Sequence, residues 1–196
     1  AFLWIDVLKV RKNIVMSNLS IAFPNLSSAE KFKIGRSSIY KMAYNFAELF
    51  IIPALDNKWV EKNVVFEGVE HCLAARDENK GVLLLSMHLG HGDMAASAIA
   101  MKVMPVIIIT KVFKNKFLND LWFSIRGAQG VQYIDAHGAN NAFEILKALK
   151  RKNAVTFVLD QFMGRPFGIP TTFFGKKTGT AYGLALFVMK TSSPVI

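Results

Sequence analysis

The sequence predicts an α/β fold in which a central, mostly parallel sheet is flanked by helices and preceded by an amphipathic helical segment. Short continuous apolar runs alternate with helical patterns in the later part, and the earlier part shows helical spacing alone. Continuous apolar strands between helices indicate a sheet buried on both faces. We expect residues 1–196 to form a single domain, helical over 1–57 and α/β over 58–196.

The first part is predicted to contain two helices. Apolar residues that would share one face of the first are Phe2, Ile5, Leu8 and Val15. A break follows at Pro24-Asn25, and Ser27 with Glu30 fits a capping box. A second apolar face then runs to Pro53 through Phe32, Ile39, Met42, Phe46, Leu49 and Phe50. Such basic, amphipathic helices either pack on a core or lie in a membrane interface.

The later part is predicted to contain four strands, at 82–86, 106–110, 132–134 and 154–159. Helices are expected near 93–102, 116–127 and 140–151. A last helix is expected at about 178–191, and the apolar residues 194–196 after it are typical of a short strand.

Composition limits the classes of function. Hydrophobic residues make up 52% of the chain and charged residues 19%, which excludes intrinsic disorder. The net charge of +10 favours a polyanionic partner, such as anionic lipid, a phosphorylated substrate or an acidic protein. Nucleic acid is disfavoured, because the basic residues are scattered and no nucleic-acid-binding motif accompanies them.

Cysteine use and hydropathy give further expectations. Cys72 is the only cysteine, so neither an internal disulfide nor a thiolate metal cluster is expected. Charged residues interrupt the apolar start, so neither a spanning helix nor a signal peptide is predicted there. Because the first residue is not Met and the last residues are apolar, we expect a fragment of a longer protein.

His88 and Asp93 are the main candidate catalytic residues. His88 follows the first predicted strand, at the carboxyl end where open α/β sheets bind ligands. Residues five apart lie about 140° apart around a helix and about 16 Å apart along a strand, so neither element lets them meet. Positive φ angles at Gly90 and Gly92 would fold the chain back and bring Asp93 to the imidazole. The carboxylate would then fix the tautomer of a general base.

Two other interpretations of this segment stay open. His88 and Asp93 are also consistent with a polar strand end and a helix cap. His88, His91 and Asp93 could supply three metal ligands, although the segment matches the His-x-His-x-Asp-His run of metallo-β-lactamases only loosely. We expect no metal and no cofactor.

The segment His88-Leu-Gly-His-Gly-Asp93 resembles the His-x4-Asp/Glu motif of the bacterial lipid A biosynthesis acyltransferases, commonly His-Leu-Gly-Asn-Trp-Glu. Other segments are similar to that family in the same order: Asn18-Leu-Ser-Ile-Ala-Phe-Pro24, Asn115-Lys-Phe-Leu-Asn119, Val158-Leu-Asp160-Gln161, Phe173-Phe-Gly175 and Ser193-Pro-Val195. The segment departs from that pattern in two ways: His91 and Gly92 stand where Asn and Trp are usual, and Asp93 takes the place of the commoner Glu.

The resemblance implies transfer of a fatty acyl chain from acyl carrier protein to a hydroxyl of a phosphorylated glycolipid, a lipid A precursor. It also implies a membrane surface as partner, at the cytoplasmic face of the bacterial inner membrane. His88 would be the general base and Asp93 its orienting carboxylate. Arg126 matches a family arginine and would bind the oxyanion or a phosphate, unless it is a surface charge. Asp160, at the end of another strand, would help shape the substrate site or cap a loop.

Two alternatives to this function are kept. One is another His-x4-Asp acyltransferase that acts on a glycerol phosphate or a mannosylated lipid. The other is a catalytically silent lipid-binding or scaffold domain. His71 and His137 have no partner pattern and are interpreted as structural.

Overall fold

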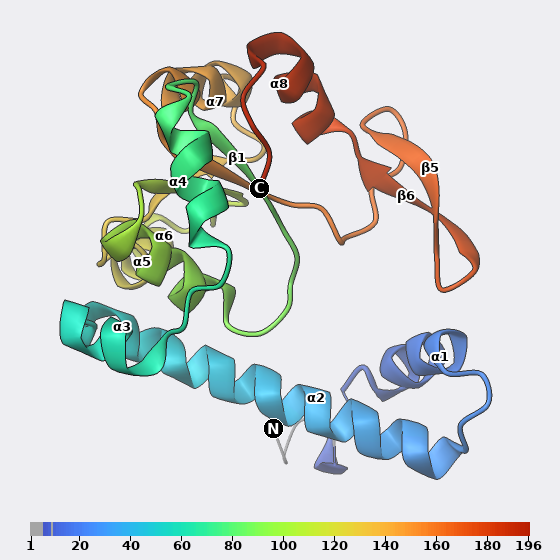
Figure 1. The fold of residues 1–196 in the computed structure, drawn as a ribbon. Helices are drawn as coiled ribbons and strands as arrows, with labels where there is room; N and C mark the ends of the chain where they lie inside the picture. Colours follow the sequence, from blue (N-terminus) through green and yellow to red (C-terminus); the bar gives the residue numbers. More distant parts are fainter. Residues whose placement is uncertain (1–5, 9) are drawn as a thin grey trace. The chain divides into compact units, whose positions relative to one another are not determined.

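A computed structural model describes residues 6–8 and 10–196 of the chain (Figure 1). The chain divides into two compact units. The first contains the chain up to Glu48 together with Pro170–Thr178, and the second contains Leu49–Ile169 and Gly179–Ile196. The single domain expected from the sequence stays a prediction.

The first unit contains α1 (Lys12–Ala22) and α2 (Ser28–Glu48). The predicted capping box at the start of α2 is confirmed: the Ser27 N–H and hydroxyl donate to the Glu30 carboxylate at 2.8 and 2.7 Å, and the Glu30 N–H donates to Ser27 Oγ at 3.3 Å. These bonds lower the pKa of Glu30. Gly35 is buried where α2 meets α1, since a Cβ there would lie 2.7 Å from Val15 Cγ1. The predicted face of the first helix falls partly on residues 1–5, outside the described part.

The second unit is built on a four-stranded parallel sheet with the order β1-β4-β2-β3. Its strands are β1 (Val82–Ser86), β2 (Val106–Thr110), β3 (Gln132–Asp135) and β4 (Ala154–Val158). All four follow the predicted positions within one residue, so the expected α/β fold is confirmed. The apolar end of the chain also pairs with the sheet: the Leu83 N–H donates to the Pro194 carbonyl at 2.9 Å, and the Ile196 N–H donates to the Leu83 carbonyl at 3.0 Å.

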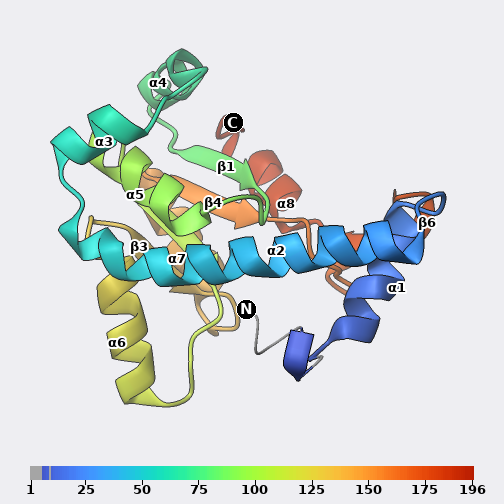
Figure 2. The same cartoon turned by 90° about the horizontal axis from the view of Figure 1, so that it is seen from below.

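Helices cover both faces of this sheet, as Figures 1 and 2 show. On one face α4 (Val69–Asp77) and α5 (Gly92–Lys102) pack against strand residues such as Val82 and Val106. On the other face α7 (Asn141–Lys150) and α8 (Gly183–Thr191) pack against Leu83 and Val155. Neighbouring residues of one strand therefore enter opposite cores, which explains the continuous apolar runs.

The remaining helices of this unit form a third cluster. The 3-10 helix η2 (Leu49–Ala54) buries Leu49 and Ile52 against residues of α3 (Asn57–Asn63), α5 and α6 (Lys116–Arg126). Among the described residues, no helix combines the length and the apolar character needed to cross a bilayer.

The predicted start of the last helix, at about residue 178, is too early. In the structure α8 begins at Gly183. The residues before it form β6 (Lys176–Ala181), which pairs with β5 (Gly168–Phe173). The two-residue turn between these strands, Phe174 and Gly175, has φ angles of 47° and 69°. β5 is largely exposed, and β6 is exposed only at its start; both contain Thr, and β6 begins with two Lys. They therefore lack the apolar run that identifies a buried strand.

Candidate active site

His88 and Asp160 form a hydrogen-bonded pair at the carboxyl edge of the sheet. The register of β1 with β4 places Ser86 beside Val158, and each site residue lies two positions beyond that pair. The Asp160 carboxylate bridges two groups of His88: Oδ1 lies 2.8 Å from ring Nδ1, and Oδ2 accepts from the backbone N–H at 2.9 Å. Parallel pairing of two strands thus holds the imidazole by one of its nitrogens.

The ionisation of Asp160 determines which ring nitrogen of His88 can accept a proton. Partial burial raises the pKa of Asp160, but the hydrogen bonds from the His88 ring and backbone outweigh it, and the pKa is lowered overall. The carboxylate is therefore ionised at neutral pH and takes a proton-bearing Nδ1 as its donor. This tautomer leaves the lone pair on Nε2, on a side chain that is 58% exposed.

The turn after His88 leads directly into α5. Gly90 has a φ of 65°, as predicted, whereas Gly92 is the first residue of the helix. His91 caps that helix, because its Nδ1 accepts from the Met94 N–H at 3.1 Å. His91 Nε2 is buried and has no partner among the described residues.

Asp93 and Arg126 form the second pair of the site. Arg126 Nε donates to Asp93 Oδ1 at 2.8 Å, and Nη2 forms an ion pair with the same oxygen at 2.7 Å; the two side chains are only 12% and 19% exposed. Asp93 lies in the first turn of α5, and Arg126 is the last residue of α6. Each charge therefore lies at the helix end whose dipole favours it.

Aromatic rings surround the guanidinium of this pair. It lies 4.9 Å from the ring of Tyr133, 5.4 Å from that of Trp122 and 5.7 Å from that of Phe123. Burial raises the pKa of Tyr133, whose hydroxyl has no partner among the described residues. The position of the Arg126 guanidinium is thus fixed by the Asp93 carboxylate and by the three aromatic rings.

The four predicted site residues meet as two pairs, with partners that differ from the prediction. His88 binds Asp160, and Asp93 binds Arg126. No hydrogen bond joins His88 to Asp93 in the part of the chain that the structure describes, so the dyad of these two residues stays a prediction. The signal that could have identified Asp160 as the partner of His88 is its position, since it follows its strand at the same offset as His88.

A pocket of about 520 Å³ opens at the carboxyl end of β2. Its lining combines apolar and cationic side chains: Thr110, Lys111, Val112, Phe113, Trp122 and Arg126. The strands are parallel, so this pocket lies at the same edge of the sheet as His88. Arg126 therefore lines a cavity while it is bound to Asp93.

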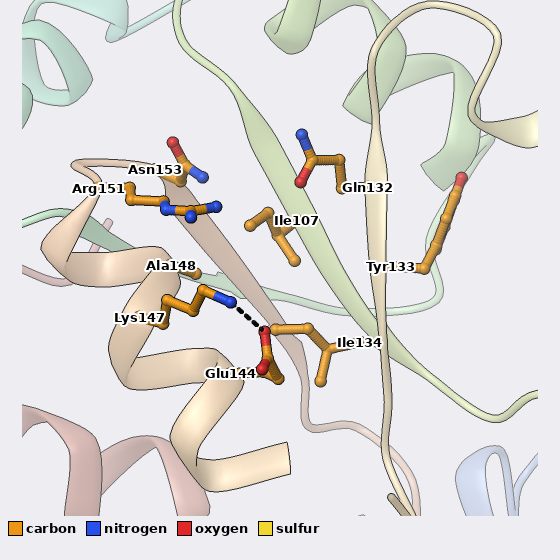
Figure 3. A pocket seen from close by; sticks show the side chains of 9 residues that line it. All are labelled: Ile107, Gln132, Tyr133, Ile134, Glu144, Lys147, Ala148, Arg151 and Asn153. Atoms are coloured by element: carbon orange, nitrogen blue, oxygen red, sulfur yellow. Dashed lines mark ion pairs between the residues drawn. The ribbon is translucent and has the colours of Figure 1, made fainter. Parts of the chain in front are cut away.

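A smaller pocket, of about 100 Å³, lies between β3 and α7 (Figure 3). Its lining includes Gln132, the first residue of β3, and Asn153, which precedes β4. Figure 3 shows the ion pair of Lys147 with Glu144 at its wall, with 3.7 Å between Nζ and Oε2. This pocket adjoins the amino ends of the strands and is separate from the His88 edge.

The metal interpretation finds no support in the described residues. In that part of the chain no three His, Cys, Asp or Glu side chains are placed to hold an ion together. Asp93 binds Arg126, and His91 uses Nδ1 as a helix cap. The ring of His88 binds a carboxylate instead.

Comparisons with known proteins agree with the family resemblance. The "Lipid A biosynthesis palmitoleoyltransferase" of Escherichia coli (strain K12) is 25% identical over 167 residues, 85% of this chain and 53% of that protein. A "Phosphatidylinositol mannoside acyltransferase" of Mycolicibacterium smegmatis is 23% identical over 160 residues, 81% of this chain and 52% of that protein. The chain thus spans about half the length of the curated relatives it matches.

The family match extends over the entire sequence. Residues 1–196 match the family described as "Bacterial lipid A biosynthesis acyltransferase". The parallel sheet, the His88 segment at its carboxyl edge and this match lead to one conclusion: the chain belongs to the bacterial lipid A biosynthesis acyltransferase family.

Proposed function

We propose that this protein transfers a fatty acyl chain from an acyl carrier protein thioester to a hydroxyl of a phosphorylated glycolipid, a lipid A precursor. The reaction would take place at the cytoplasmic face of the bacterial inner membrane. The observation that carries the proposal is the His88 pair: one ring nitrogen is held by Asp160, and the other is left on an exposed ring to accept a proton.

The proposed chemistry needs no covalent enzyme intermediate. His88 Nε2 removes the proton of the acceptor hydroxyl as its oxygen attacks the thioester carbonyl carbon. The tetrahedral intermediate then expels the thiolate, which takes the proton back from the imidazolium. The products are an ester and the free thiol of the carrier. Asp160 stabilises the imidazolium formed between the two steps, because its carboxylate is hydrogen-bonded to Nδ1.

Asp93 and Arg126 are assigned to the same site in a supporting role. Their largely buried ion pair fixes the first turn of α5, directly after the turn that carries His88. Arg126 also lines the 520 Å³ pocket, where its charge would attract a substrate phosphate or the oxyanion. A dyad of His88 with Asp93 would require Asp93 to leave Arg126, and substitution of Asp160 and Asp93 in turn distinguishes the two arrangements.

Charge and the relatives support the proposed acceptor class. A net charge of +10 suits a phosphorylated lipid and an acidic carrier protein. The Escherichia coli relative acts in lipid A synthesis by its name. The similarity to a phosphatidylinositol mannoside acyltransferase favours a mannosylated phospholipid as the second candidate acceptor.

The test is an acyl transfer assay with acyl carrier protein thioesters and both acceptor lipids, run on wild type, His88→Ala and His71→Ala. His71 is an exposed histidine of α4 and serves as the matched control. We expect transfer to the lipid A precursor by wild type and by His71→Ala, and a loss of about 10²–10⁴-fold in His88→Ala. Equal rates in all three proteins would rule out His88 as the base. Tight lipid binding without any transfer would favour the silent lipid-binding domain.

A further inference from the structure

The amino-terminal half of α6 exposes an apolar face. Phe117, Leu118 and Leu121 are 74%, 52% and 48% exposed, and no residue of the helix is buried. Residues at positions i, i+1 and i+4 lie on one side of a helix, so these three side chains form one continuous strip. Figure 2 shows the loop after β2 and the first turns of α6 standing out from the sheet.

The loop before α6 extends this strip and is fixed to the helix. Phe113, 48% exposed, packs edge-on against Trp122 with 5.8 Å between ring centroids. Its backbone N–H donates to Asn119 Oδ1 at 3.0 Å, and Asn115 caps the helix by accepting from the Leu118 N–H at 3.0 Å. The exposed apolar side chains are therefore held in a defined surface, which we call the α6 surface: Phe113, Phe117, Leu118 and Leu121.

Lysines surround the α6 surface. Lys111, Lys114 and Lys116 lie beside it and are exposed, and the one acidic residue of 111–121, Asp120, is paired with Lys116. Long lysine side chains can rest on an apolar boundary while their ammonium groups reach anionic headgroups. An apolar strip with a basic border is the pattern of a helix that lies in a membrane interface.

We propose that the α6 surface docks on an anionic phospholipid bilayer, with the strip of Phe117, Leu118 and Leu121 inserted among the acyl chains. This inference rests on the proposed function in one respect, since it assigns the membrane contact named there to a specific surface. Phe113 belongs both to this surface and to the wall of the 520 Å³ pocket. Docking would therefore place the mouth of that pocket at the level of the lipid. An acidic protein partner is disfavoured, because large apolar side chains dominate the α6 surface.

The test is a fluorescence measurement on Phe117→Trp, with Phe143→Trp as the matched control. Phe143 is a phenylalanine of α7 that is 64% exposed. Vesicles of phosphatidylcholine and phosphatidylglycerol with brominated acyl chains quench only tryptophans that reach the hydrocarbon. After subtraction of the signal of the natural tryptophans, we expect quenching at position 117 and none at 143. Because the readout is tied to a position, it does not depend on any other membrane contact of the protein.

A second measurement tests membrane docking independently of acyl transfer. Phe117→Ser with Leu121→Ser should weaken binding to these vesicles by about tenfold for each side chain removed from lipid. The double variant should keep its transfer rate on detergent-dispersed acceptor, and Phe143→Ser should bind like wild type. Equal quenching at 117 and 143, or unchanged vesicle binding, would overturn the inference. So would retained vesicle binding with a loss of carrier protein binding, since the α6 surface would then be a protein-docking site.

Discussion

Replacing Asp160 by asparagine tests the core of the proposed site. The carboxylate accepts the His88 ring on one oxygen and the His88 backbone N–H on the other, whereas an amide has a single oxygen. One hydrogen bond is therefore lost, and the ionic character of the other disappears. A hydrogen bond to a charged group contributes about 1.5–3 kcal/mol. Because His88 and Asp160 are 58% and 33% exposed, we take the lower end of that range.

The expected effect is a fall in kcat of about 10- to 30-fold, from about 1.5–2 kcal/mol at about 1.4 kcal/mol per factor of ten. The assay is transfer from acyl carrier protein thioester to dispersed lipid acceptor, with saturating substrates, so that binding effects are separated from the chemical step. Asp93→Asn is measured beside it. If Asp160→Asn keeps the wild-type kcat while Asp93→Asn loses it, His88 works with Asp93 and the proposed role of Asp160 is wrong.

The same substitution has a consequence for stability against pH. The pKa of Asp160 is lowered in the folded protein, so the ionised carboxylate stabilises the fold above the unfolded value of about 3.9. This contribution disappears as the pH falls through the lowered folded pKa. Thermal unfolding of wild type and Asp160→Asn should differ most above the unfolded pKa of about 3.9 and converge as the pH falls through the lowered folded pKa of Asp160. A difference that stays constant over this range would contradict the assigned ionisation.

Two further substitutions test the packing around the site. Arg126→Met should lower the free energy of unfolding by about 1–3 kcal/mol in urea denaturation, because it leaves the largely buried Asp93 carboxylate, 19% exposed, without its partner. Gly81→Ala should cost about 2–5 kcal/mol, because φ is +73° and the new Cβ would lie 2.6 Å from the Leu149 carbonyl oxygen. Gly90→Ala should cost only about 1–2 kcal/mol by the same measurement, since φ is +65° but the new Cβ would meet no neighbouring atom within 4 Å.

Controls for these variants are available in the chain. Lys116 pairs with Asp120 on the surface, with side chains 88% and 57% exposed, so Lys116→Met should leave the free energy of unfolding almost unchanged. A comparable loss of unfolding free energy in Arg126→Met and Lys116→Met would show that the Asp93–Arg126 pair stabilises the fold no more than an exposed pair does. Equal costs for Gly81→Ala and Gly90→Ala would show that the backbone adapts at Leu149.

Several elements could be predicted because their signals are local. The capping box of Ser27 and Glu30 needs only three residues of separation, and the four buried strands are indicated by continuous apolar runs. The strands β5 and β6 could not be recognised in this way, because exposed strands carry polar residues. Local patterns report burial, and they fail where an element is not buried.

The candidate site residues were proposed from the sequence, but the contacts that they make were not. His88 and Asp160 are 72 residues apart, and they meet only because β4 lies beside β1. Asp93 and Arg126 are 33 residues apart and meet where the start of α5 reaches the end of α6. Strand order and helix packing depend on which apolar faces fit together over the entire unit, and spacing along the chain does not contain that information.

The sequence by itself therefore determined the fold class and the positions of the four buried strands, and it proposed His88, Asp93, Arg126 and Asp160 as candidate site residues, since each of these follows from local pattern or family motif. Only the tertiary structure decided that Asp160 holds the His88 ring and that Arg126 holds Asp93. The physical reason is competition for partners: a carboxylate binds the donor that packing brings within about 3 Å, and packing is a property of the folded chain as a whole.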